Sequence, residues 1–169
     1  RRHALNHSSA LSKLDLPKAI AIARIGVAIL FTLFAEYKLV NGNFAHHLFP
    51  DYVKEFVDTD AVRFYAKFLA AVVQPHPVFF GYLVGVIEFA IALSMLLGWR
   101  VRELSIVGAL FMVNMILCTW WAPGHGVAVW KYFGAELDHI PLLLLFLIFY
   151  AGDAGTVWGL DGLRRPASS

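Results

Sequence analysis

The sequence predicts an all-α integral membrane protein: a four-helix transmembrane bundle with an amphipathic interfacial helix in its first outer loop. Hydrophobic residues occupy 59% of the 169 positions and charged residues only 15%, whereas a typical soluble domain carries about a quarter charged residues. Four long apolar segments alternate with shorter polar stretches. This composition excludes a disordered chain, and a net charge of +2 gives no reason to expect nucleic-acid binding.

The four apolar segments approach the length of about 20 helical residues that crosses a bilayer. We expect the spans at residues 19–40, 78–99, 104–121 and 139–152, of which the last is short. Only a tight turn around Arg100 and Arg102 joins the second and third segments. These two helices should therefore be antiparallel neighbours.

The first outer loop, residues 41–77, is too apolar for a simple linker. Asp60 is a predicted N-cap, and Pro75 and Pro77 should end the helix that follows it. Between them, apolar residues recur at helical spacing: Ala61, Tyr65, Phe68 and Val72. This pattern predicts an amphipathic helix that lies on the membrane surface or packs over the mouth of the bundle.

Basic residues indicate the orientation of the bundle. They concentrate before the first span, in the turn after the second and beyond the fourth: Arg1, Arg2, Lys13, Lys18, Arg100, Arg102, Arg164 and Arg165. The positive-inside rule then places both termini in the cytoplasm. We expect a cytoplasmic segment at 1–18, a membrane domain at 19–162 and a cytoplasmic tail at 163–169. The chain starts with Arg, which leaves open whether the N-terminus is complete.

Ionic residues inside the predicted spans are the main candidates for function, because a charge at the bilayer centre costs about 2.5–3.5 kcal/mol and usually has a partner or lines a cavity. At about 1.5 Å per residue, Arg24 lies about 7 Å and Glu88 about 15 Å from the inner boundary. We therefore predict an Arg24–Glu88 contact. A structural ion pair that fixes helix register is the simpler interpretation, and a catalytic Glu88 is the alternative.

Lys38 ends the first span on nearly the same helix face as Arg24, since fourteen residues separate them. Lys38 either extends to the lipid headgroups or binds a ligand together with Arg24. Glu36 is its simplest neutralising neighbour and a further ligand-binding candidate. Asn114, in the third span, can hydrogen-bond to another helix.

Histidines and aromatic residues gather on the predicted outer side. The histidines there are His46, His47, His125 and His139, and histidine carries protons readily near neutral pH. His139, at the start of the fourth span, is a candidate catalytic proton carrier. Trp130 and its aromatic neighbours would form a flat wall for a quinone ring, although such residues are also common at membrane interfaces. We predict no metal site, since His46 and His47 do not share a helix face, and Cys118 is more typical of a small core residue.

Several of these features together resemble the DoxX/DoxD family of small four-helix membrane proteins. They are Arg24, Lys38 and Glu88, the LLGWRVR turn at 96–102, and the GDAGTVWGLDG segment at 152–162. The resemblance extends over about residues 19–162. It implies a prokaryotic cytoplasmic-membrane location and a link to thiosulfate:quinone oxidoreductase, which oxidises thiosulfate to tetrathionate and passes electrons to membrane quinone.

Two functions follow from the resemblance. The first is a quinone-linked oxidoreductase subunit in which Arg24 and Lys38 hold an anion or a quinone oxygen and Glu88 or His139 carries protons. The chain shows no motif for a bound cofactor and has one thiol, so such an enzyme would need a partner membrane or extracytoplasmic subunit. The second is a non-catalytic accessory subunit of a larger electron-transfer or photosynthetic complex. A small transporter is a weaker third interpretation, because the chain has no repeat symmetry.

Overall fold

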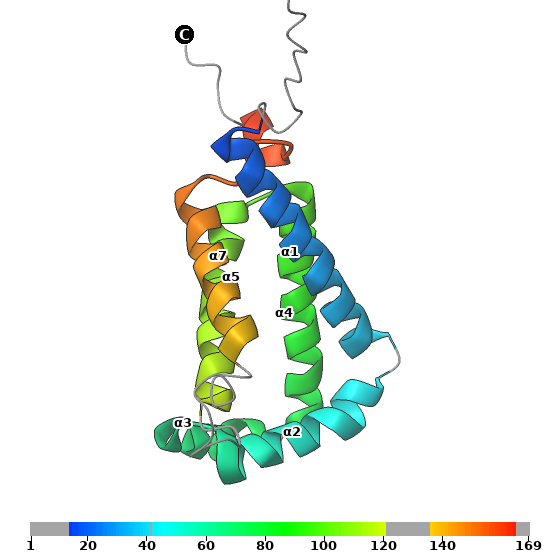
Figure 1. The fold of residues 1–169 in the computed structure, drawn as a ribbon. Helices are drawn as coiled ribbons and strands as arrows, with labels where there is room; N and C mark the ends of the chain where they lie inside the picture. The colour runs from blue at the N-terminus through cyan, green and yellow to red at the C-terminus, as the bar shows by residue number, and fades with distance from the viewer. Residues whose placement is uncertain (1–13, 41, 121–135, 165–169) are drawn as a thin grey trace, which may run out of the picture.

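Four apolar helices stand side by side in the computed structural model, which describes residues 14–40, 42–120 and 136–164 (Figure 1). Three of them are long and apolar enough to cross a membrane: α1 (Leu16–Leu39), α4 (Pro77–Leu97) and α5 (Val101–Thr119). The fourth, α7 (Glu136–Ala151), is apolar but has 16 residues, or about 24 Å of helix. The predicted fourth span is therefore a shorter helix than the other three.

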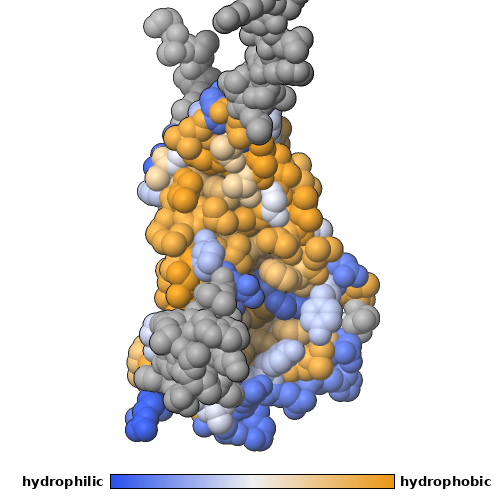
Figure 2. All heavy atoms as spheres, viewed as in Figure 1, coloured by the Kyte–Doolittle hydropathy of each residue, from blue (hydrophilic) through white to orange (hydrophobic). Residues whose placement is uncertain are grey.

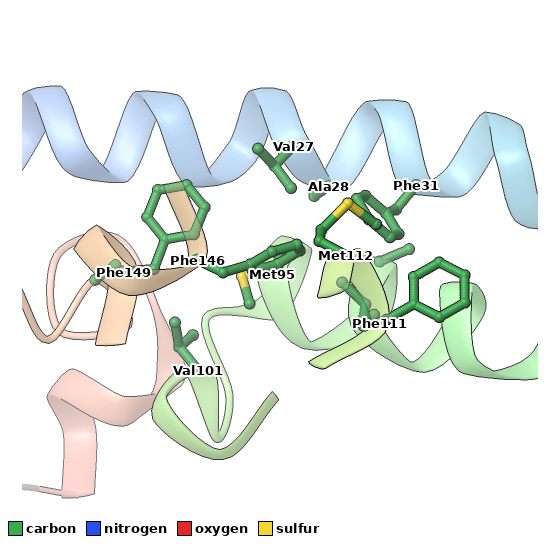
Figure 3. Close-up of a cluster of buried hydrophobic side chains, with 12 residues drawn as sticks. Val27, Ala28, Phe31, Met95, Val101, Phe111, Met112, Phe146 and Phe149 are labelled. Atoms are coloured by element: carbon green, nitrogen blue, oxygen red, sulfur yellow. The ribbon is translucent and has the colours of Figure 1, made fainter. Parts of the chain in front are cut away.

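The helices form two closely packed pairs, α1 with α4 and α5 with α7. The buried core lies between the pairs and is built mainly from aromatic and aliphatic side chains (Figure 3). Phe31 of α1 meets Phe146 of α7 edge to face, with ring centroids 5.6 Å apart. A β-carbon at Gly108 of α5 would lie only 2.5 Å from the Phe146 ring, so this glycine allows α5 and α7 to approach. The turn between α4 and α5 makes these helices antiparallel, as expected, although each packs more extensively on another helix.

A curved chain of short helical segments crosses one end of the bundle, opposite the end that carries Leu16 and Leu160–Arg164 (Figure 1). We call these segments the collar and the opposite end the terminal end. The collar runs through η2 (Phe44–Leu48), α2 (Phe49–Glu55), η3 (Phe56–Asp60), α3 (Arg63–Phe68) and η4 (Leu69–Val73). The η segments here are π-helical. Such wider turns bend a helix, and the collar curves accordingly.

Two details of the predicted interfacial helix are wrong. Asp60 ends η3 and its carboxylate accepts a hydrogen bond from Thr59, whereas α3 begins three residues later, after Val62. The buried collar residues here are Ala61, Leu69 and Val73, and Phe68 and Val72 are exposed instead. For Val72 and Val73 the reason is the π-helical η4, because its wider turn changes the spacing of residues that share a face.

The terminal end is held together by the segment that follows α7. Gly98 ends α4 in the left-handed conformation, with φ of +61°, and Arg100 precedes α5 with φ of +53°. The Asp161 carboxylate, in η5 (Leu160–Arg164), accepts the backbone N–H groups of Arg100 and Val101, both at 2.9 Å. A residue 60 positions away thus caps the N-terminus of α5 and satisfies donors that a helix start leaves open.

Candidate functional site

Lys38 and Glu88 form a buried ion pair between α1 and α4. The Lys38 ammonium donates to Glu88 Oε1, and the two side chains are only 17% and 4% exposed. Lys38 Nζ also lies over the rings of Phe34 and Phe44, at 5.8 and 5.2 Å from their centroids, a cation–π arrangement that further stabilises the ammonium. Glu36, the neutralising neighbour expected from the sequence, is exposed on α1.

The predicted Arg24–Glu88 contact is wrong. Arg24 is fully buried at the terminal end, where its Nη2 donates to the Trp158 carbonyl oxygen at 3.0 Å. Helical side chains lean toward the N-terminus of their own helix. Arg24 therefore extends toward the terminal end, whereas Glu88 of the antiparallel α4 extends toward the collar. The same rule brings Lys38 back into the bundle, toward Glu88.

Two glycines of α4 make this pairing possible. A β-carbon at Gly85 would lie 2.9 Å from Leu39 Cγ and 3.2 Å from Lys38 Cβ, and one at Gly81 would lie 2.8 Å from the Ala45 backbone. The sequence Gly81-x-x-x-Gly85 is a small-residue motif typical of close helix contacts in membranes. This motif was not among the features used to predict helix contacts, and Glu88 lies about one turn beyond it. This motif is the sequence signal from which the Lys38–Glu88 pair could have been predicted.

A cavity of about 590 Å³ lies between the ion pair and the collar. This volume is within the range of about 300–1,000 Å³ typical of small-molecule sites. Its walls come from α1, the collar, α4 and α5, and they are mainly aromatic and aliphatic. The lining residues are Phe34, Tyr37, Lys38, Phe44, Phe49, Tyr52, Val53, Glu55, Phe56, Leu69, Val73, Phe80, Val84, Asn114, Met115 and Cys118. Figure 2 shows a hollow where the hydrophobic surface of the helices meets the hydrophilic collar.

Glu88 adjoins this cavity through Lys38, which lines it. Phe80 and Val84 line it from α4, and Glu88 follows them at the same four-residue spacing, so the three share one helix face. Glu88 Oε2 is buried and has no hydrogen-bond partner among the described residues. An unsatisfied buried carboxylate oxygen is costly. Oε2 is closed off from the cavity, so a ligand hydroxyl would reach it only after the Glu88 side chain turns.

The collar is tied to the bundle beside the cavity. Tyr65 donates its hydroxyl hydrogen bond to Asn114 Oδ1, and the Val62 backbone N–H donates to the Leu117 carbonyl oxygen at 3.0 Å. Burial, with a smaller contribution from Cys118, raises the pKa of Tyr65 to about 12. The phenol is therefore neutral near pH 7 and able to donate. Asn114 thus joins α5 to the collar, as the sequence suggested for an interhelical contact.

The other predicted site residues lie apart from the ion pair. His139 is half-buried at the start of α7, with its Nδ1 3.5 Å from Thr119 Oγ1, and Thr119 follows the cavity-lining Cys118. His46 packs edge-on against Tyr82, with centroids 5.8 Å apart. Trp130 and His125 lie outside the described residues. Within residues 14–40, 42–120 and 136–164, no cluster of three His, Cys, Asp or Glu side chains could hold a metal ion.

Comparison with known proteins adds the family to this geometry. The family model for DoxX matches residues 19–123, which contain the collar, α4, α5 and all but the first three residues of α1. The chain belongs to the DoxX family. The DoxX match and the three span-length helices together identify an integral membrane protein. Searches of curated proteins and of solved structures found no match.

The DoxX match includes the ion pair and the described residues that line the cavity. It ends before the segment that caps α5, so Trp158 and Asp161 lie beyond the matched range. The candidate site of this DoxX protein is therefore contained in its family region.

Proposed function

We propose that this DoxX protein is a quinone-binding membrane subunit of a redox system. The aromatic cavity that ends at the Lys38–Glu88 pair is the observation that carries the proposal. Flat rings line the space, which suits a planar apolar ligand, and polar groups occur at few positions, which fixes its orientation. The Lys38 ammonium can donate to a ring oxygen, and a turn of the Glu88 side chain would let its buried Oε2 accept from a ring hydroxyl.

The balance of charge favours a neutral ligand over an anion. Glu88 neutralises Lys38, and Glu55 adds a negative charge at the cavity wall. Thiosulfate would therefore find no net positive site here. If thiosulfate is the reductant, we propose that a partner subunit oxidises it and that this chain holds the quinone.

The overall reaction would transfer two electrons from thiosulfate to a quinone. Two thiosulfate ions give one tetrathionate and two electrons, and one quinone takes up these electrons and two protons to form a quinol. Glu88, beside the cavity, is the candidate proton carrier, because a carboxyl next to a lysine can exchange a proton with a ring oxygen. His139, on the neighbouring α7, is the second candidate carrier.

The test uses the protein in lipid nanodiscs, alone and with its co-purifying partner. A fully substituted quinone such as decyl-ubiquinone should bind, and Glu88→Gln should weaken binding or thiosulfate-dependent quinone reduction by at least about tenfold. Glu103→Gln, an exposed glutamate at the start of α5, is the matched control and should leave both unchanged. Absence of quinone binding in both preparations would falsify the proposal.

An accessory subunit without catalysis is the second candidate, and Arg24 favours it. This arginine is fully buried, and it donates to the Trp158 carbonyl oxygen and does not line the cavity. Its role is therefore structural. Stoichiometric co-purification with an electron-transfer complex, together with full activity of that complex after Glu88→Gln, would support this alternative.

We also propose that α7 crosses the membrane as a fourth span, that the collar lies at the membrane surface, and that the terminal end faces the cytoplasm of a prokaryotic cell. Lys18, Arg100 and Arg102 lie at the terminal end, which supports this orientation by the positive-inside rule. The collar carries Asp51, Asp58 and Asp60 as well as basic residues.

A further inference from the structure

We propose that ligands enter the cavity sideways from the lipid, between the last turns of α1 and helix α2, and that an apolar tail stays outside along α1. The inference rests on the proposed function for the identity of the ligand, but the route itself follows from the shape of the site. The ligand class is accordingly a neutral amphiphile with a ring head and a long hydrocarbon tail.

The opening is marked by residues that both line the cavity and reach the surface. Phe34 and Tyr37 of α1 are 43% and 51% exposed, Tyr52 of α2 is 43% exposed, and Glu55, the last residue of α2, is exposed at the collar side. Deeper lining residues such as Val53, Leu69 and Cys118 are buried. The mouth therefore lies between α1 and α2, on the side of the molecule.

The depth of this mouth places it next to hydrocarbon. Phe34 precedes the end of α1 at Leu39 by five residues, or about 8 Å along the helix. Since α1 is longer than the hydrocarbon core of about 30 Å, Phe34 lies within reach of the acyl chains.

An exposed apolar stripe leads away from the mouth along α1. Leu30, Leu33, Phe34 and Tyr37 are all exposed, and the spacing of three and four residues places them on one helix face. A cavity of about 590 Å³ takes a ring and a short chain but not a long polyprenyl tail. The stripe provides the surface along which such a tail would lie in the lipid.

Cys118 is a built-in reporter for entry, since it is the chain's single cysteine, is buried and lines the cavity. A maleimide modifies it by addition of the thiol across the ring double bond, with no leaving group. In nanodiscs, which expose both membrane faces, we expect a lipid-soluble alkyl maleimide to label Cys118 and a sulfonated maleimide in the aqueous phase to label it at least about tenfold more slowly.

Changes at the mouth should alter the labelling rate in both directions. Phe34→Trp should slow alkyl maleimide labelling, and Phe34→Ala should accelerate it, each by about threefold or more. Phe89→Trp, at a residue of α4 that is 51% exposed, is the matched control and should have no effect. Equal labelling by both maleimides, or rates insensitive to Phe34, would overturn the route.

A quinone series separates failure of the route from failure of the proposed function. Ubiquinone analogues with no tail, a decyl tail or a decaprenyl tail should protect Cys118 equally at equal membrane concentration, within about threefold, because a tail that remains in lipid gains no new apolar environment. Exclusion of the decaprenyl form alone would reject the external tail. Failure of every quinone to protect, with the Phe34 effects intact, would reject the proposed function and leave the route standing.

Discussion

At the scale of single residues, side-chain direction decides which buried charges meet. Depth along the helix axis placed Arg24 and Glu88 within reach of each other, but their side chains extend toward opposite ends of the bundle. Lys38 was expected either at the headgroups or at a ligand, and it turns inward to Glu88. Of the ionic residues that the sequence placed in the spans, Arg24, Lys38 and Glu88 turn inward and Glu36 is exposed. The predicted partner of Glu88 was wrong.

The Lys38–Glu88 pair can be tested by removing one or both charges. Lys38→Met should lower the free energy of unfolding by about 3–5 kcal/mol, because it leaves Glu88 buried and unpaired. Combining it with Glu88→Met should restore most of this loss, as apolar replacements of a buried pair are often neutral. Reversible denaturant titration in mixed micelles measures both.

Lys67→Met is the control for this pair, because Lys67 is exposed on α3 and its replacement should change stability by less than about 0.5 kcal/mol. If the single and double variants were equally destabilised, the pair would not be what makes Lys38→Met costly.

Tyr65 provides a prediction on pH. Of the six tyrosines, Tyr65 should ionise late in the folded protein, near its pKa of about 12, rather than near 10. Between these values the unfolded chain loses a proton that the folded chain keeps, so stability should fall as the pH rises through this window. Alkaline absorbance titration follows the phenolates.

Tyr65→Phe should remove the late-ionising component from that titration and leave the other tyrosines unchanged. The Tyr65→Phe variant should also lack the part of the stability loss at alkaline pH that Tyr65 causes. A titration in which the variant and the parent protein have the same late component would contradict the assignment.

At the scale of elements, hydrophobicity predicted helix ends well and turn chemistry poorly. The predicted spans begin and end within about three residues of α1, α4, α5 and α7. The π-helical turns of the collar were not expected, because 3.6-residue periodicity cannot reveal an inserted residue. The Asp161 cap was equally hidden, since helix caps are sought next to the helix and this one is distant in sequence.

Gly98 should be essential to the turn between α4 and α5. Its left-handed φ of +61° costs an L-residue about 1–2 kcal/mol, and a β-carbon there would also overlap Arg24 Nη1. We therefore expect Gly98→Ala to lower stability by more than about 2 kcal/mol, measured by thermal unfolding in detergent.

Gly26→Ala is the matched control, because a β-carbon at Gly26 in the middle of α1 would meet nothing within 4 Å. This variant should be neutral or stabilising by up to about 1 kcal/mol. If both variants lost a similar amount of stability, neither the backbone conformation nor the Arg24 contact would explain the effect of Gly98→Ala.

At the scale of the whole molecule, the sequence predicted an all-helical membrane protein, and the helices and the family confirm this much. It predicted contact between the first two spans and placed the second and third side by side, but it did not predict that α5 packs mainly on α7. Apolar faces that meet lipid and faces that meet protein have similar composition. The cavity could not be predicted from the sequence either, because it depends on how the collar folds over α1, α4 and α5.

The orientation of the molecule can be tested with new cysteines in a Cys118→Ser background. In intact bacterial cells that express the protein, Lys67→Cys on the exposed face of α3 should react with an impermeant maleimide. Leu163→Cys, at a residue that is 82% exposed at the terminal end, should react only after the cells are opened. The reverse pattern would place the collar in the cytoplasm.

The cap that Asp161 provides has a consequence for biosynthesis. The ribosome makes α1, α4 and α5 long before it reaches residue 161, so the start of α5 and the guanidinium of Arg24 wait for partners supplied by the segment that follows α7. Helices already inserted by the translocon can thus reach their final arrangement only after residue 161 has been made. A nascent chain that terminates early would leave a buried arginine without its acceptor, a state suited to recognition by membrane quality-control proteases.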